Sequence, residues 1–137
     1  MIGILIVTHP KLGEALIDTA EFILGNRPEA VRALSIDINE NAEDLRRKIT
    51  TSIKAVDGNQ GVLIMTDMFG GTPSNLSYSL LEEGRIEVIS GVNLPLLIRA
   101  VNYRAKKPLN ALVQDLEIYG KKSISLASAL LKGNKRG

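Results

Sequence analysis

The stretch Ile2-Gly3-Ile4-Leu5-Ile6-Val7 is an unbroken apolar run, rich in β-branched residues and as long as one strand. This pattern is typical of a strand that is buried on both faces of a parallel sheet. Residues 61–66 repeat the pattern, and residues 31–36 and 86–90 are predicted to form two further strands. Helical periodicity follows each of these four segments. The alternation of strands and helices predicts an α/β fold with right-handed crossovers.

The predicted architecture is a doubly wound, three-layer α/β/α sheet of four parallel strands in the order 2-1-3-4. Helices are expected over residues 11–24, 41–56, 73–84, 94–104 and 108–120, the last with Gly120 as its cap. Residues 123–128 alternate like an antiparallel edge strand, which we predict, although Leu126, Leu130 and Leu131 also fit a helix. The expected domain spans residues 1–131, and residues 132–137 are expected to be a basic, disordered tail.

Composition excludes several classes of site and of protein. The 137 residues include no Cys and one His, so disulfides, thiolate nucleophiles and Cys- or His-rich metal sites are excluded, and no metal or cofactor is expected. The longest apolar run has six residues, far fewer than the ~20 that a membrane span needs. It also lacks the flanks of a secretion signal. A cytoplasmic location is therefore expected.

Taken alone, the net charge of +2 suggests a nucleic-acid partner, but the positive charge is concentrated at one end of the chain. Five of the 17 basic residues lie in residues 121–137, which contain no acidic residue. Residues 1–120 therefore hold twelve basic residues against all 15 acidic ones. With only three Tyr, two Phe and no Trp, the chain also lacks the aromatic side chains on which single-stranded nucleic acids stack. No nucleic-acid binding is expected.

Three unusual loops leave the carboxyl ends of the predicted strands, where open α/β sheets place their ligand sites. They are residues 8–10, 67–75 and 90–95. In the predicted strand order His9 and Asp67 lie side by side. Alone, His9 also fits a surface or capping histidine, and Asp67 also fits an Asx turn. Together they form a pair in which the carboxylate fixes the imidazole tautomer and leaves the other ring nitrogen as a nucleophile.

The turn Gly70-Gly71-Thr72-Pro73-Ser74 fits either a tight entry into a helix or a phosphate-binding turn. In the second interpretation backbone N–H groups at Gly70 and Gly71 and the hydroxyls of Thr72 and Ser74 contact the anion. There is no Walker motif and no G-x-G-x-x-G after a strand, so nucleotide binding has no support. The remaining candidate residues are expected to line the pocket or to contact a partner: Thr8, Met68, Phe69, Ser90 and Asn93. Of these, Met68 and Phe69 are expected to be exposed and to form a docking patch. The alternative for Asn93 is a helix cap.

These three motifs, in this order and spacing, resemble the mannose-type enzyme IIA of the bacterial phosphoenolpyruvate-dependent sugar phosphotransferase system. The resemblance covers about residues 1–130. It implies a doubly wound α/β phosphotransferase that accepts a phosphoryl group from HPr on His9 and passes it to a IIB protein or domain, with Asp67 as the orienting carboxylate. It also implies a homodimer that exchanges an edge strand, and a link to the membrane only through a transporter complex.

Two features differ from the well-known sugar-transporting members. Phe69 stands where they often have Trp, and many of them continue through an Ala/Pro-rich linker into a IIB domain, whereas this sequence ends. We expect a separate IIA subunit, or a regulatory phosphoprotein of a phosphotransferase chain without sugar transport. The phosphotransferase subunit of dihydroxyacetone kinase is a further alternative, although it tends to lack the Gly-Gly-Thr-Pro turn. A flavodoxin-like ligand binder is the alternative without phosphoryl chemistry.

Overall fold

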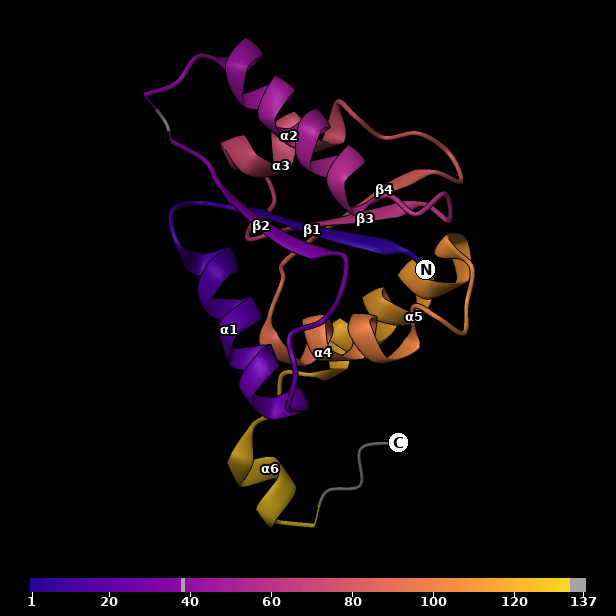
Figure 1. The fold of residues 1–137 in the computed structure, drawn as a ribbon. Coiled ribbons are helices and arrows are strands. Elements are labelled where there is room, and N and C mark those ends of the chain that lie inside the picture. The colour runs from indigo at the N-terminus through magenta and orange to yellow at the C-terminus, as the bar shows by residue number, and fades with distance from the viewer. Residues whose placement is uncertain (38, 134–137) are drawn as a thin grey trace.

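A four-stranded parallel sheet forms the centre of the computed structural model, which describes residues 1–37 and 39–133 (Figure 1). The strands are β1 (Gly3–Thr8), β2 (Val31–Ser35), β3 (Val62–Thr66) and β4 (Ile86–Ser90). Their order is β2-β1-β3-β4, and all three pairings are parallel. The predicted fold class and strand order are confirmed.

The two central strands are buried along their whole length, which explains their continuous apolar sequences. Helices cover both faces of the sheet (Figure 1). On one face lie α2 (Ala42–Val56) and α3 (Thr72–Tyr78), and on the other lie α1 (Leu12–Leu24), α4 (Leu94–Tyr103) and α5 (Leu109–Lys122). Two separate apolar clusters fill the layers between helices and sheet.

Side-chain caps fix where two of the helices begin. The Asn41 side chain accepts a hydrogen bond from the backbone N–H of Asp44 at the start of α2, and Asn93 accepts one from Leu96 N–H at the start of α4. At the far end of α4 the buried Arg104 guanidinium donates to the backbone carbonyls of Ile2 and Glu29. It thereby ties this end of α4 to the start of the sheet.

Two helices end at other positions than expected. Helix α3 stops at Tyr78 instead of continuing to Gly84, and the N–H groups of Leu80 and Leu81 bond three residues back in tight turns. Helix α5 runs through Gly120 to Lys122, so the expected cap at Gly120 is wrong. A Cβ atom at position 120 would lie 3.1 Å from Leu96 Cδ1, so the glycine provides the close packing between α5 and α4.

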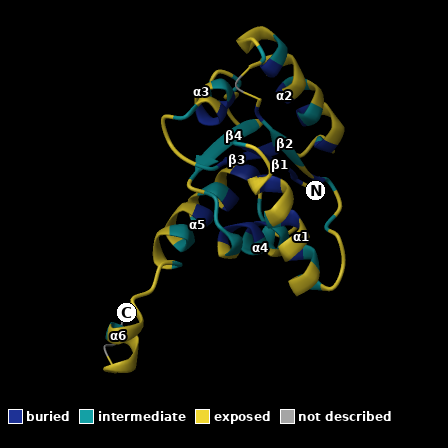
Figure 2. Ribbon diagram, turned by 90° about the vertical axis from the view of Figure 1, so that its left-hand side faces the viewer, coloured by how far each residue is buried: buried dark blue, intermediate teal, exposed yellow. Residues whose placement is uncertain are grey.

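The predicted edge strand over residues 123–128 is wrong. Residues 124–126 belong to no strand, and Ala127–Leu131 form a short helix, α6. An edge strand needs a neighbouring strand to pair with, whereas the four-residue spacing of Leu126 and Leu130 suits a helical turn. Figure 2 shows α6 projecting away from the layered body with its residues mostly exposed. Of the expected tail, residues 134–137 lie outside the described residues.

None of the helices in the described part of the chain combines the length and the apolar composition needed to cross a bilayer.

Candidate active site

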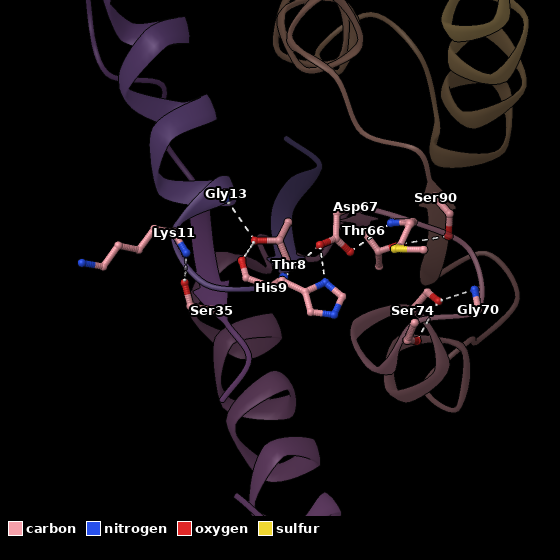
Figure 3. Close-up of polar contacts among 12 residues, drawn as sticks. Thr8, His9, Lys11, Gly13, Ser35, Thr66, Asp67, Gly70, Ser74 and Ser90 are labelled. Atoms are coloured by element: carbon pink, nitrogen blue, oxygen red, sulfur yellow. Dashed lines mark hydrogen bonds and ion pairs between the residues drawn. The ribbon is translucent and has the colours of Figure 1, made fainter. Parts of the chain in front are cut away.

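His9 and Asp67 lie in direct contact at the carboxyl end of the sheet (Figure 3). The distance from His9 Nδ1 to Asp67 Oδ2 is 2.6 Å, and the His9 backbone N–H donates to the same oxygen at 2.9 Å. This contact follows from topology, because β1 and β3 are parallel neighbours with Val7 opposite Thr66. The residues that follow each strand therefore emerge side by side, as the strand order predicted.

Thr8 holds the His9 loop in place. Its hydroxyl donates to the His9 carbonyl at 2.7 Å and accepts from the Gly13 N–H at 3.0 Å, so one fully buried side chain links the loop to the first turn of α1. Thr8 was expected to line the pocket, but its side chain is fully buried and bonds to the backbone of His9 and Gly13 instead. Figure 3 shows the Lys11 side chain pointing away from the His9 ring.

The electrostatics of the pair favour an ionised carboxylate. Burial raises the pKa of the Asp67 carboxyl, but hydrogen bonds from the His9 backbone, the His9 ring and the Met68 backbone N–H together outweigh it. The net result is a pKa below the ordinary value of 3.8. Asp67 is therefore a carboxylate at neutral pH, and its Oδ2 is placed to accept a proton carried on His9 Nδ1.

In the tautomer that carries its proton on Nδ1, facing Asp67, Nε2 of His9 keeps its lone pair. The His9 side chain is 43% exposed and Asp67 only 11%, so the ring reaches solvent while its anchor stays covered. A neutral imidazole held in one tautomer, with its free nitrogen open to solvent, can act as a nucleophile toward a second protein or a small molecule.

The glycine turn faces the ring. A glycine at position 71 avoids crowding the imidazole ring, because a Cβ atom there would lie 3.3 Å from His9 Cε1. Gly70 serves the turn through its backbone, which has a φ of +86°. The first turn of α3 leaves the N–H groups of Thr72 and Ser74 without intrahelical acceptors.

The two hydroxyls of this turn have different surroundings. Thr72 is exposed, whereas Ser74 is fully buried. The Ser74 hydroxyl accepts from the Gly70 N–H at 3.1 Å and donates to the Gly71 carbonyl at 3.0 Å. It therefore closes the turn itself, while the Thr72 side chain stands at its surface.

Ser90 at the end of β4 and Asn93 in the following loop both border a groove, as expected of pocket-wall residues, and both also make structural hydrogen bonds. Ser90 is bonded to Thr66 on β3 and to Tyr78 at the end of α3. Asn93 caps α4 and also donates to the Ser123 hydroxyl at 3.2 Å, which ties it to the end of α5. Sequence reasoning missed Tyr78, because its approach to Ser90 depends on how α3 packs, and no local motif signals that.

Met68 and Phe69 are exposed, as predicted from their position in the loop. Their exposed fractions are 57% and 78%. They stand between Asp67, which contacts the histidine, and the glycine turn.

The chain is similar in sequence and fold to known proteins. The family model EIIA-man, described as the PTS system fructose IIA component, matches residues 3–117. The chain belongs to the EIIA-man family. This result confirms the resemblance that the three motifs suggested.

EIIA-man relatives share both sequence and fold with the chain. It is 37% identical over 108 residues to the PTS system mannose-specific EIIAB component of Escherichia coli, covering 78% of this chain but only 33% of that relative. It is 29% identical to the PTS system fructose-specific EIIA component of Bacillus subtilis, covering 96% of this chain and 90% of that one. The crystal structure of the phosphotransferase system component EIIA from Streptococcus agalactiae superposes with a TM-score of 0.83 at 28% identity, over 94% and 99% of the two chains.

Proposed function

We propose that this EIIA-man protein is a phosphoryl carrier of the sugar phosphotransferase system, with His9 as the residue that holds the phosphoryl group. The observation that carries the proposal is the 2.6 Å contact between His9 Nδ1 and Asp67 Oδ2. It reserves one ring nitrogen for a carboxylate and leaves Nε2 free and solvent-facing. Metal or nucleotide is not required for transfer between two histidines.

The transfer is an in-line displacement at phosphorus. The Nε2 lone pair of His9 forms a P–N bond while the P–N bond of a phosphohistidine donor breaks, and the donor imidazole leaves with that electron pair. The proton on Nδ1 stays where it is. The His9 ring therefore gains positive charge as the bond forms, and the Asp67 carboxylate stabilises that charge at hydrogen-bond distance. Transfer to the next acceptor is the same step with His9 as the leaving group.

The glycine turn supplies donors for the phosphoryl oxygens. Gly71 lies next to the ring, and the N–H groups of Gly71, Thr72 and Ser74 are the backbone donors that this turn offers, with the exposed Thr72 hydroxyl as a side-chain donor. The buried Ser74 hydroxyl acts by shaping the turn. Backbone donors that are already in position lose little entropy when charge develops on the transferred group.

Membership of the EIIA-man family supports a proposal for the partners. We propose HPr as the donor and a IIB protein or domain as the acceptor, with the membrane involved only through a transporter complex. The exposed Met68 and Phe69 beside the histidine support a protein as the reaction partner, because an apolar surface next to a reactive group suits docking of another protein.

A homodimer is also proposed. Four large apolar side chains at the C-terminal end, at positions 124, 126, 130 and 131, are between 48% and 87% exposed in the single chain. A short helix that buries none of its residues gains little stability alone. Association with a second copy would cover these side chains. Sedimentation velocity should give a dimer that Leu126→Asp/Leu130→Asp converts to a monomer; a monomeric wild type would contradict it.

Reconstituted phosphorylation tests the carrier function. Incubation with phosphoenolpyruvate, enzyme I and HPr should add one acid-labile phosphoryl group, about 80 Da in mass. The His9→Ala variant should acquire none. An acid-stable adduct on a serine or threonine would overturn the assignment. Addition of a IIB protein should then discharge the phosphorylated chain, whereas a purely regulatory phosphoprotein would keep its phosphoryl group.

A further inference from the structure

Three hydroxyl groups form a chain of hydrogen bonds beside the active-site loop. Thr66 Oγ1 donates to Ser90 Oγ at 2.8 Å, and Tyr78 OH lies 2.6 Å from the same Ser90 oxygen. Thr66 and Ser90 are register partners on β3 and β4, and Thr66 is fully buried. The sheet thus provides a rigid base for the Tyr78 hydroxyl.

The ring of Tyr78 in turn supports Phe69. The two ring centroids lie 5.8 Å apart with the planes inclined by 46°, a tilted aromatic pair. Both rings border a groove of about 430 Å³ whose other walls include Ser90, Gly91 and Ile124. Phe69 is 78% exposed, so its orientation depends strongly on the few contacts that it makes.

The segment from Asp67 to Tyr78 is therefore held to the sheet near both ends. Asp67 is joined to the His9 loop after β1, and Tyr78 is joined to Ser90 at the end of β4. Phe69 and the glycine turn lie between these two anchors. Loss of the Tyr78 anchor would free Phe69 while leaving the His9–Asp67 pair in place.

We propose that Tyr78, held by Ser90 and Thr66, is a positioning residue that fixes Phe69 as the docking surface for the partner phosphocarrier protein. This inference rests on the proposed phosphoryl-carrier function. Tyr78 contacts Phe69 and Ser90 and makes no bond to His9, so its role is in recognition and not in the chemical step.

Steady-state phosphorylation by phospho-HPr tests this role through the split between KM and kcat. Tyr78→Leu should raise KM for phospho-HPr about three- to tenfold, the range expected for loss of one aromatic contact, with kcat unchanged. Ser90→Ala should change KM in the same direction. Tyr119→Phe is the control, because that ring stacks on Arg99 and is not among the residues that line the groove, and it should leave both constants unchanged.

A double variant separates positioning from general damage to the fold. Phe69→Ala/Tyr78→Leu should have the same KM as Phe69→Ala alone, because Tyr78 acts through Phe69. An unchanged KM in Tyr78→Leu, additive effects in the double variant, or a fall in kcat without a rise in KM would each overturn the proposal.

A second measurement does not depend on phosphoryl transfer. The chain has no Trp, so Phe69→Trp introduces a single indole whose local motion can be followed by time-resolved fluorescence anisotropy. Adding Tyr78→Leu should increase the fast local motion of the indole, and adding Tyr119→Phe should not. Equal mobility in all three proteins would refute the positioning role. If wild type accepts no phosphoryl group, the carrier function fails, while this measurement still decides whether Tyr78 holds residue 69.

Discussion

Replacing Asp67 with asparagine removes the carboxylate charge beside the His9 ring while keeping the size of the side chain. In the wild type, one carboxylate oxygen accepts from both His9 Nδ1, at 2.6 Å, and the His9 backbone N–H, at 2.9 Å. An asparagine carbonyl can accept the same proton, so the tautomer that exposes Nε2 is retained. What is lost is the negative charge that stabilises the ring as the P–N bond forms, together with the acceptor for the Met68 N–H, which the asparagine NH₂ group cannot replace.

The size of the effect follows from the strength of a charged hydrogen bond. Such a bond contributes about 1.5–3 kcal/mol, which corresponds to a rate change of roughly 10- to 150-fold. The His9 side chain is 43% exposed, and solvent screening places the expected loss in the lower part of that range. We therefore expect Asp67→Asn to slow phosphoryl transfer about 10- to 50-fold.

Rapid-quench measurement of single-turnover transfer from phospho-HPr, at saturating donor, isolates this step. Asp18→Asn is the matched control, because Asp18 is 70% exposed on α1 and pairs with Arg27 away from the histidine. It should leave the transfer rate unchanged. A wild-type rate in Asp67→Asn would refute the reasoning that charge on Asp67 stabilises the phosphorylated ring.

Three further predictions concern the glycines and the acid response. Gly71→Ala should fold normally but slow phosphorylation, because its Cβ atom would lie 3.3 Å from His9 Cε1; a wild-type rate by rapid quench would contradict this. Gly120→Ala should lower the free energy of unfolding by about 1 kcal/mol, because crowding of the buried Leu96 outweighs the gain in helix propensity; urea titration showing stabilisation would contradict it. The pKa of Asp67 is lower in the folded protein than its unfolded value of 3.8, so the ionised carboxylate stabilises the fold above pH 3.8. This stabilisation is lost as the pH falls through the lower pKa of the folded state. The stability difference between wild type and Asp67→Asn should therefore shrink as the pH falls below 3.8; a difference that grows below that pH would contradict it.

The sheet and the central pair could be predicted because both depend on strong, simple patterns. The run Ile2–Val7 is apolar throughout because β1 is buried on both faces, and its neighbour β3 repeats the pattern for the same reason. Once the strand order is given, the carboxyl ends of adjacent parallel strands must meet. The contact of His9 with Asp67 follows from that rule without any knowledge of side-chain packing.

The features of the fold and of the site that could not be predicted from the sequence depend on contacts between distant segments. Gly120 looked like a helix cap, but it is the point at which α5 packs on Leu96 of α4. Residues 123–128 fit two periodicities, and no single-sequence pattern decides whether a neighbouring strand is present to pair with them. Tyr78 carries no motif, because its partner Ser90 is brought to it by the packing of α3 against the sheet.

The attachment point of the phosphoryl group can be read by long-range proton–nitrogen NMR on the phosphorylated protein labelled with nitrogen-15, which tests the role of His9 directly. One phosphohistidine is expected, at His9, with phosphorus bonded to Nε2 and the proton retained on Nδ1 beside Asp67. Because His9 is the only histidine, its ring signals can be assigned without ambiguity. A phosphoryl group on Nδ1, or an unmodified imidazole after incubation with phospho-HPr, would contradict the central claim.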